Sequence, residues 1–431
     1  MGMSDSLSLS NPPGPASDWQ AWLESRLPAA RRGLLHQAGE MAVRLGMPLY
    51  VVGGFVRDGL LDLAPNDFDL VVEGAAPRLA LALAHELGGT VTAHAPFGTA
   101  TWQTTEGWTV DFATARTETY ARPAALPEVR PADLAADLHR RDITINAMAL
   151  QLGPGGQLRD PYLGRADLAA GLIRGLYPTT FQDDPTRLFR AVRYEQRLGF
   201  RVEPETLGWM PEAWEALDAL SADRLRHEFE LIFREPQAAA MLGRLAELNI
   251  LRHAHPALRW GDLQTAAAAE IPRLPLAEWK LAGALEPDAL YLTLMLAEAS
   301  PADADGALAR LNVNRLTNEA VHDALGLKLT ASRPSQVTAQ LDGLSETALA
   351  AAYVCHPAWR GALHDYLACW RWVRPATTGD DLVAMGLTPG PFFKVILQQV
   401  RAARLDGWVS DEAGERELIR QLLTMRSADG R

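Results

Sequence analysis

The sequence predicts an α+β protein in which an α/β N-terminal part is followed by a long, mostly helical part. Up to about residue 150, short apolar runs bounded by glycines alternate with helical stretches. Beyond about residue 160, amphipathic helical stretches dominate and are separated by proline-rich joints. With 431 residues the chain is too long for one ordinary core, so we expect roughly two to four domains or subdomains.

The composition, with 48% hydrophobic and 22% charged residues, is typical of a soluble globular protein. No apolar run reaches membrane-spanning length, and the N-terminus lacks a signal pattern. The two cysteines, Cys355 and Cys369, make neither a disulfide framework nor a zinc site. We therefore expect a cytoplasmic protein without membrane association. The net charge of −12 argues against indiscriminate coating of nucleic acid but leaves specific RNA binding open.

The expected elements follow one another in a simple order. Residues 1–17 are rich in Ser, Pro and Gly, which predicts a disordered tail. A helical pattern over 18–46 is broken near Pro28. The later ranges are a strand over 48–52, a short helix over 55–62, a strand over 67–72, a helix over 77–89, and two strands within 90–116 that turn at Glu106–Gly107.

Two aspartates stand one residue apart in the second expected strand. Because side chains alternate along a strand, Asp67 and Asp69 point to the same face and Phe68 points into the core. Two carboxylates held this close repel each other unless a cation sits between them, and Mg²⁺ is the natural partner. The alternative is a turn cluster, since Asn66 and Asp67 follow Pro65.

Two glycines end the first expected strand, in "VVGGFVRD". Gly53 and Gly54 let the backbone approach a phosphate closely, and the free N–H groups of the following helix favour anions. Arg57 lies one helical turn further and adds a forked positive charge. These glycines, with the aspartate pair, predict a site for a metal-bound nucleoside triphosphate.

This combination resembles the DNA polymerase β-like nucleotidyltransferase superfamily. Three later segments are similar, in order, to motifs of bacterial class II tRNA nucleotidyltransferases and bacterial poly(A) polymerases: "RRDITINAMAL" (140–150), "DPYLGRADLAAGLIR" (160–174) and "DDPTRLFRAVRYEQRLGF" (183–200). The similarity is specific over about 48–202 and weaker at 221–233. It implies a polymerase β-like head with a small mixed sheet (18–150) and an all-helical remainder, divided into a neck (151–210), a body (211–340) and a tail that binds tRNA (341–431).

The resemblance also implies the reaction. A primer 3′-hydroxyl attacks the α-phosphate of an incoming nucleotide in line and expels pyrophosphate, with two Mg²⁺ ions about 3.5–4 Å apart. Asp67 and Asp69 are expected to hold the metals, and Gly53, Gly54 and Arg57 the triphosphate. Asp111, in "WTVDFATAR", is expected to be a third catalytic carboxylate, although a plain strand-end aspartate is the alternative.

In "RRDITINAMAL", Arg141 resembles the family's nucleotide-contacting arginine, and Asp142 and Asn146 are expected near the sugar. A structural interpretation of the same residues is a helix that Asp142 caps, with Ile145, Met148 and Ala149 on its buried face. Both interpretations are compatible.

In "DDPTRLFRAVR", Asp184 and Arg187 are three residues apart and would share a helix face. Cytosine and adenine each present an amino donor beside a ring-nitrogen acceptor, whereas guanine and uracil present a carbonyl and a ring N–H. A carboxylate with a guanidinium therefore selects C and A without a nucleic-acid template. Arg190 and Arg193 continue the face, and we expect a bound triphosphate to relieve their mutual repulsion.

The segment 112–139 has a proline-rich middle and is predicted to be a mobile surface loop. It resembles the flexible loop that accompanies the switch from C to A addition in this family, and which enzymes adding only CC tend to lack. Its presence favours a CCA-adding or A-adding enzyme.

Other functions deserve comparison. The doublets His322-Asp323 and His364-Asp365 suggest a metal phosphohydrolase, but the remaining ligands that such a site needs are missing. A non-catalytic RNA-binding protein is disfavoured because the aspartates and the Asp184–Arg187 pair are intact. A poly(A) polymerase shares all the motifs but often has a long basic C-terminal extension, whereas this sequence ends in "GERELIRQLLTMRSADGR", which is mixed in charge. We expect tRNA as acceptor with ATP and CTP as substrates, and leave CCA, A-only and CC-only addition open.

Overall fold

The computed structural model describes residues 19–429 apart from 26, 28, 64–68, 95–96, 154 and 282–284. The predicted tail over 1–17 and the predicted metal ligand Asp67 therefore lie outside the described residues. The chain forms two compact units: residues up to Glu228 together with Leu248–Ala254, and Phe229–Glu247 together with His255–Arg431. The predicted division into head, neck, body and tail stays a prediction.

The first unit contains a seven-stranded sheet with the order β3-β4-β5-β2-β1-β8-β9. Strands β2 and β5 are parallel and the other neighbours are antiparallel, so the sheet is mixed. The strands are β1 (Leu49–Val52), β2 (Asp69–Val72), β3 (Thr90–His94), β4 (Thr99–Gln103), β5 (Thr109–Thr114), β8 (Ala149–Leu152) and β9 (Leu158–Arg159). The helices before and between them are α1 (Trp19–Glu24), α2 (Ala29–Leu45), α3 (Gly54–Leu60) and α4 (Ala76–Leu87).

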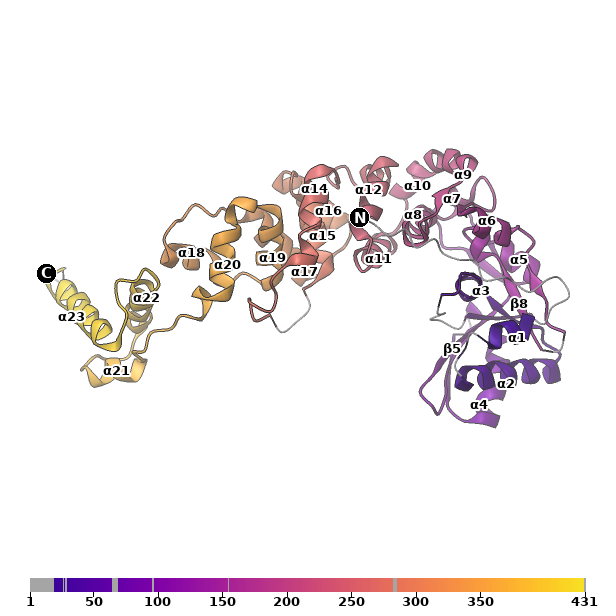
Figure 1. The fold of residues 1–431 in the computed structure, drawn as a ribbon, viewed down its shortest axis with the longest axis horizontal. Coiled ribbons are helices and arrows are strands. Elements are labelled where there is room, and N and C mark those ends of the chain that lie inside the picture. The colour runs from indigo at the N-terminus through magenta and orange to yellow at the C-terminus, as the bar shows by residue number, and fades with distance from the viewer. Residues whose placement is uncertain are drawn as a thin grey trace. The chain divides into compact units, whose positions relative to one another are not determined.

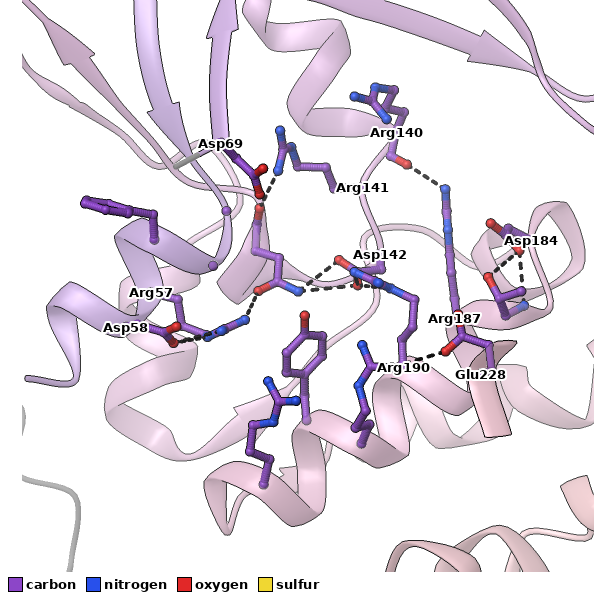
Figure 2. A pocket seen from close by; sticks show the side chains of 18 residues that line it. Arg57, Asp58, Asp69, Arg140, Arg141, Asp142, Asp184, Arg187, Arg190 and Glu228 are labelled. Carbon is purple, nitrogen blue, oxygen red and sulfur yellow. Dashed lines mark hydrogen bonds and ion pairs between the residues drawn. The ribbon is translucent and has the colours of Figure 1, made fainter. Parts of the chain in front are cut away.

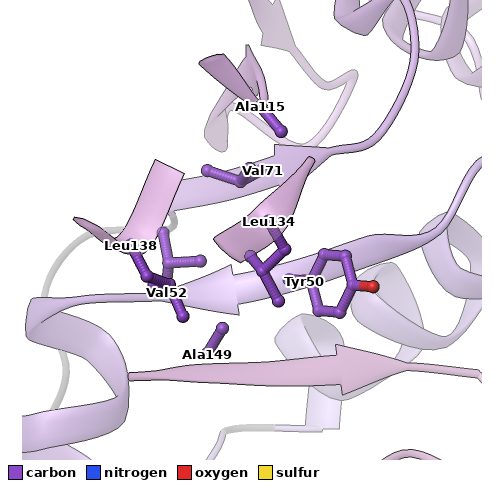
Figure 3. Packing of buried hydrophobic residues seen from close by; sticks show 7 residues of the cluster. All are labelled: Tyr50, Val52, Val71, Ala115, Leu134, Leu138 and Ala149. Carbon is purple, nitrogen blue, oxygen red and sulfur yellow. The ribbon is translucent and has the colours of Figure 1, made fainter. Parts of the chain in front are cut away.

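Alternation along the central strands gives each face of the sheet its own packing. Tyr50 and Val52 of β1 point to the face that α5 (Leu134–His139) covers, and there they pack with residues of β2, β8 and α5 (Figure 3). Helix α4 packs against β3, β4 and β5, and α2 packs against α4 and β8. Burying each large apolar side chain contributes about 1.5–3 kcal/mol. This packing fixes the strand ends that carry Gly53 and Asp69.

Three local predictions differ from the structure. Residues 90–116 form three strands, of which β4 and β5 turn at Glu106–Gly107 as predicted. In place of a loop throughout 112–139, β6 (Arg116–Thr119) and β7 (Glu128–Pro131) pair as a hairpin ahead of α5. The helix that Asp142 could cap does not form, because residues 149–152 pair with β1 and only a short 3₁₀ turn precedes them, η2 (Thr144–Asn146).

Helices dominate the chain after β9. In the first unit they are α6 (Gly164–Ala170), α7 (Thr180–Asp183), α8 (Thr186–Leu198), α9 (Pro204–Trp209), η3 (Met210–Ala213), α10 (Trp214–Asp218), the start of α11 (Ala222–Phe233) and α13 (Ile250–Ala254). A two-residue parallel pair, β10 (Leu172–Ile173) with β11 (Arg201–Val202), accompanies them.

The second unit consists of helices and connecting turns among the residues that the structure describes (Figure 1). Several helices begin at a Ser, Thr or Asn whose side chain accepts a hydrogen bond from the backbone three residues on, as at Ser300, Asn314 and Ser345. The elements are α12 (Ala238–Glu247), α14 (Asp262–Ala268), η4 (Ile271–Arg273), α15 (Pro287–Leu296), α16 (Pro301–Arg310), α17 (Arg315–Gly326), α18 (Pro334–Leu341), α19 (Glu346–Cys355), η5 (Pro357–Trp359), α20 (Arg360–Ala368), η6 (Trp370–Trp372), α21 (Gly379–Ala384), α22 (Pro391–Leu405) and α23 (Glu412–Asp429).

The architecture confirms the predicted fold class, an α+β head with a small mixed sheet followed by a helical remainder. Within the described ranges, no helix is long and apolar enough to cross a membrane.

Candidate active site

A cavity of about 610 Å³ lies in the first unit between the strand ends of the sheet and helix α8 (Figure 2). Its walls come from α3, the start of β2, the segment around η2, α8 and the start of α11. It gathers eleven residues that the sequence predicted for the site: Gly53, Gly54, Arg57, Asp69, Arg141, Asp142, Asn146, Asp184, Arg187, Arg190 and Arg193.

Gly53 makes the turn from β1 into α3. Its φ of 64° is a conformation that glycine adopts without strain, and a Cβ there would lie 2.8 Å from Nη1 of Arg141. The buried Arg57 follows on α3, where its Nη1 donates to Oδ1 of Asn146 at 2.5 Å. Its Nε and Nη2 lie 2.8 and 2.7 Å from Oδ1 of Asp58. One N–H on each terminal nitrogen remains for a ligand.

Asp142 is the centre of the polar network in the cavity. Its carboxylate accepts from Nδ2 of Asn146 at 3.2 and 3.3 Å, from the backbone N–H of Ile143 at 2.9 Å and from Nε of Arg190 at 2.8 Å. Burial alone would raise its pKa, but the Arg190 guanidinium and these hydrogen bonds outweigh burial and lower the pKa to about 2. Asp142 therefore stays ionised and connects the head to α8.

The acidic edge of the sheet carries Asp69 and Asp111. Asp69 begins β2 and is directly opposite Asp111 on the parallel strand β5, and both side chains are exposed. Oγ1 of Thr101, on β4, donates to Oδ1 of Asp111 at 2.6 Å. A second cavity of about 390 Å³ is lined by both aspartates and by Thr101, Arg140 and Arg141.

This edge suits a hard cation. Two exposed carboxylates brought side by side are the oxygen ligands that Mg²⁺ takes while it keeps water and phosphate oxygens. Among the described residues, which exclude Asp67, no group of three or more His, Cys, Asp or Glu side chains is arranged to hold a metal ion. The histidines of the two doublets have other neighbours: His322 pairs with Asp305 at 3.1 Å, and Nδ1 of His364 accepts from Nε1 of Trp279 at 3.2 Å.

Asp184 does not share a helix face with Arg187, so that prediction was wrong. It is extended, with φ −137° and ψ 97°, because the following Pro185 disfavours helical backbone at the residue before it, and α8 begins only at Thr186. Its Oδ1 accepts from Oγ1 of Thr186 at 2.7 Å and from Nη2 of Arg224 at 2.6 Å. Both Asp184 and Arg187 nevertheless line the same cavity (Figure 2).

Arg187 is buried and held at both ends of its guanidinium. Nη1 donates to Oγ1 of Thr180 at 2.6 Å and to the hydroxyl of Tyr177 at 3.0 Å, and Nη2 donates to the carbonyl of Arg140 at 2.6 Å. Its Nε–H and one Nη2–H are left for a ligand. A guanidinium fixed in this way presents donors in a set direction, as recognition of a ring nitrogen requires.

The two other predicted arginines of α8 have carboxylate partners from other elements. Nη2 of Arg190 lies 2.7 Å from Oδ2 of Asp142, and Nη1 of Arg193 lies 3.3 Å from Oε2 of Glu228. These carboxylates already relieve the repulsion between the arginines. The expectation that a bound triphosphate is needed to relieve it was therefore wrong. Their role in phosphate binding stays a prediction.

Some residues around the cavity were missed. Asp137 is fully buried and holds both Arg140 at 2.7 Å and Arg141 at 3.0 Å, and Glu118 of the β6–β7 hairpin also pairs with Arg140 at 2.9 Å. The spacing of Asp137 from the two arginines, three and four residues, was a readable signal. Arg224, which holds Asp184, lies 40 positions away, and nothing in the sequence indicated this contact.

Comparison with known proteins identifies two matching family models. The model for a poly A polymerase head domain matches residues 49–174. The model for a probable RNA- and SrmB-binding site of polymerase A matches residues 199–260. The first of these segments contains the glycine turn and the acidic edge.

Three curated relatives span most of this chain. An A-adding tRNA nucleotidyltransferase of Halalkalibacterium halodurans is 35% identical over 411 residues, which are 90% of this chain and 92% of that relative. One of Geobacter sulfurreducens is 33% identical over 410 residues, 89% of this chain, and the match spans only 46% of that longer relative. A CC-adding tRNA nucleotidyltransferase of Deinococcus radiodurans is 32% identical over 384 residues, 87% of this chain and 89% of that relative.

Two solved structures resemble most of the chain. A CCA-adding enzyme in its apo form II has a TM-score of 0.84 and 29% identity, covering 94% of this chain and 99% of the other. The Thermotoga maritima CCA-adding enzyme complexed with tRNA has a TM-score of 0.79 and 28% identity, with coverages of 94% and 99%.

Proposed function

The chain belongs to the tRNA nucleotidyltransferase family, and we propose that it adds nucleotides to the 3′ end of tRNA without a nucleic-acid template. The cavity carries this proposal, because it combines a glycine turn, the ionised Asp142 and fixed arginines with an acidic sheet edge in one unit. In the reaction, the tRNA 3′-hydroxyl attacks the α-phosphate of the nucleotide, and pyrophosphate leaves from the opposite side.

The nucleotide is expected to bind with its base near Asp184 and Arg187 and its triphosphate near Gly54, Arg57 and Arg141. Arg57 is rigid because Asp58 and Asn146 hold it, and its free N–H groups are suited to phosphate oxygens. Arg190 and Arg193 add positive charge along α8. This fixed field stabilises the charge that develops on the departing pyrophosphate.

Members of the family use divalent metal ions in general, and we propose Mg²⁺ for this chain. Asp67, Asp69 and Asp111 would hold it, and the ion would supply charge stabilisation at the attacking and leaving oxygens. The role of Thr101 is to fix one oxygen of Asp111, which leaves the other oxygen of that carboxylate for the ion.

Base selection is expected to come from Asp184 and Arg187 acting as a pair. The guanidinium of Arg187 donates to the ring nitrogen, and the carboxylate of Asp184 accepts from the exocyclic amino group. Arg224 and Thr186 hold the carboxylate, so it would not rotate to suit a base with the opposite pattern. A mismatched base would leave buried polar groups unpaired, which makes the discrimination strong.

Within the family we propose A addition to tRNA that already ends in CC. Two relatives that match about nine-tenths of this chain are A-adding enzymes, at 35% and 33% identity. The hairpin segment 112–139 adds support, because it resembles the loop that CC-adding enzymes tend to lack. A tRNA substrate also favours the cytoplasmic location that the sequence predicts.

The test is a gel assay with the purified full chain. Three tRNA transcripts, ending before CCA, after C and after CC, receive single nucleotides or CTP with ATP, all with Mg²⁺. We expect one A on the CC-ended transcript only, and none with Asp69→Ala. Addition of C, C and A in turn to the transcript that ends before CCA would identify a CCA-adding enzyme. Addition that stops after CC would identify a CC-adding enzyme. Long A tails on any RNA would favour a poly(A) polymerase, and no incorporation at all would refute nucleotide addition.

A further inference from the structure

Tyr194 is surrounded by four arginines, and the proposed reaction gives it no role. It stands on α8, lines the cavity and is only 8% exposed. The guanidinium carbon of Arg57 is 4.7 Å from its ring centroid, and those of Arg190, Arg193 and Arg197 are each 5.8 Å from it. Because Arg57 comes from α3, the ring joins the glycine-turn helix to α8.

The aromatic ring explains only part of this arrangement. A cation over an aromatic face gains about 0.5–1 kcal/mol at an exposed site and about 2 when desolvated, which offsets some repulsion among the guanidiniums. A phenylalanine ring would provide this attraction as well. The hydroxyl of Tyr194 therefore needs an explanation of its own.

That hydroxyl makes no hydrogen bond to any residue that the structure describes. The hydroxyl is not one of the fully buried polar atoms without a partner, so it opens into the cavity that Tyr194 lines, where a ligand oxygen can accept its hydrogen bond. Four guanidiniums within 6 Å of the ring select an anion, and the cavity also contains the glycine turn at Gly53 and Gly54. An anion with several oxygens in a row matches these donors.

The charges around Tyr194 make its hydroxyl a stronger donor. Burial alone would raise the pKa of the phenol, but Arg190, Arg57 and Arg193 outweigh burial and lower it, against an opposing contribution from Asp142. A more acidic phenol forms a stronger hydrogen bond to a phosphate oxygen while it keeps its proton. Once ionised, it would repel the same anion.

We propose that Tyr194 is a further binding residue of the nucleotide site. Its hydroxyl donates a hydrogen bond to an oxygen of the bound triphosphate, and its ring holds the Arg57 guanidinium beside α8. The identification of the anion as a nucleoside triphosphate rests on the proposed function. The anion contact itself does not depend on tRNA.

Inorganic tripolyphosphate tests the anion contact separately from the proposed function, because it carries no base and its binding can be measured without tRNA. Its affinity for the full chain would be measured by titration calorimetry for wild type, Tyr194→Phe and the control Tyr291→Phe, a half-buried tyrosine of the second unit stacked on Phe233. We expect Tyr194→Phe to bind about 10-fold more weakly, the effect of one hydrogen bond to a charged group. Tyr291→Phe should match the wild type.

Binding by Tyr194→Phe within twofold of wild type would overturn the proposal, and so would a wild type that does not bind tripolyphosphate. A chain that shows the expected loss but adds no nucleotide to tRNA would refute the proposed function alone. Two further readouts exclude a purely structural role. With ATP and tRNA, KM for ATP should rise about 10-fold while kcat changes less than about twofold. As the pH rises, the affinity of the wild type for tripolyphosphate should also fall at a pH below the ordinary pKa of tyrosine, because Tyr194 ionises. Tyr194→Phe should lack this fall.

Discussion

Replacing Asp142 by Asn should destabilise the first unit in a pH-dependent way. The carboxylate of Asp142 is buried and pairs with Arg190 at 2.7 Å, and its pKa is lowered from 3.8 to about 2. A depression of this size corresponds to about 2–3 kcal/mol of folding stability at pH 7. Asn cannot supply the charge, and it leaves the partly exposed Arg190 guanidinium without its ion-pair partner. We expect Asp142→Asn to lose about 2–3 kcal/mol.

The sign of the pH dependence follows from the lowered pKa. Stability that comes from Asp142 is complete above its unfolded pKa of 3.8 and is lost as pH falls through about 2. The gap between wild type and Asp142→Asn should therefore be widest at neutral pH and shrink by about 1 kcal/mol at pH 3.

Urea unfolding followed by circular dichroism at pH 7 and pH 3 measures this gap. The matched control is Asp218→Asn, the same substitution at an exposed position of the same unit. Asp218→Asn should have the same urea midpoint as the wild type at both pH values. If Asp142→Asn also unfolded with the wild type at pH 7, or if its deficit were equally large at pH 3, the ion pair would not stabilise the fold as argued.

Three further substitutions test separate parts of the site. Gly53→Ala puts a Cβ 2.8 Å from Arg141 in a left-handed backbone, so kcat/KM for ATP should fall at least about 10-fold in steady-state assays. Thr101→Val removes the donor to Asp111, so half-maximal activity should need several-fold more Mg²⁺ in a metal titration. Arg224→Met removes the ion-pair partner of Asp184, so the preference for ATP over GTP should fall about 10-fold in single-nucleotide assays, with partial recovery in Arg224→Lys.

Each of these has a contrary result. Wild-type kinetics for Gly53→Ala would show that the turn tolerates a Cβ and that Arg141 can move. An unchanged Mg²⁺ titration for Thr101→Val would argue against Asp111 as a metal ligand. Unchanged selectivity for Arg224→Met would show that Asp184 is held well enough by Thr186 alone.

The sequence predicted the head well because its signals were local. The strand before Gly53 and the short helix after it are consecutive. The strand that begins with Asp69 continues as a buried apolar run, and the strand that carries Asp111 alternates apolar and polar residues over most of its length. The pairing of those strands was not visible, yet parallel β2 and β5 bring the two aspartates into register. Chain order alone could not say that β5 would be the neighbour.

Where prediction failed, tertiary contacts outweighed local preference. Ala149 was expected on the buried face of a helix, but pairing of residues 149–152 with β1 makes them a strand. Asp184 looked helical by spacing, but Pro185 keeps it extended. The arginines of α8 looked unopposed because Asp142 and Glu228 come from other elements. Tyr194 was not predicted for the site, because the Arg57 guanidinium over its ring comes from another element, α3.

The most direct test of nucleotide addition is the intact mass of a tRNA transcript that ends in CC, after incubation with the enzyme, Mg²⁺ and an equal mixture of ATP, CTP, GTP and UTP. Selection by Asp184 and Arg187 without a template predicts a gain of one adenylate and nothing further. A gain of guanylate or uridylate, a ladder of adenylates, or no gain at all would contradict the account.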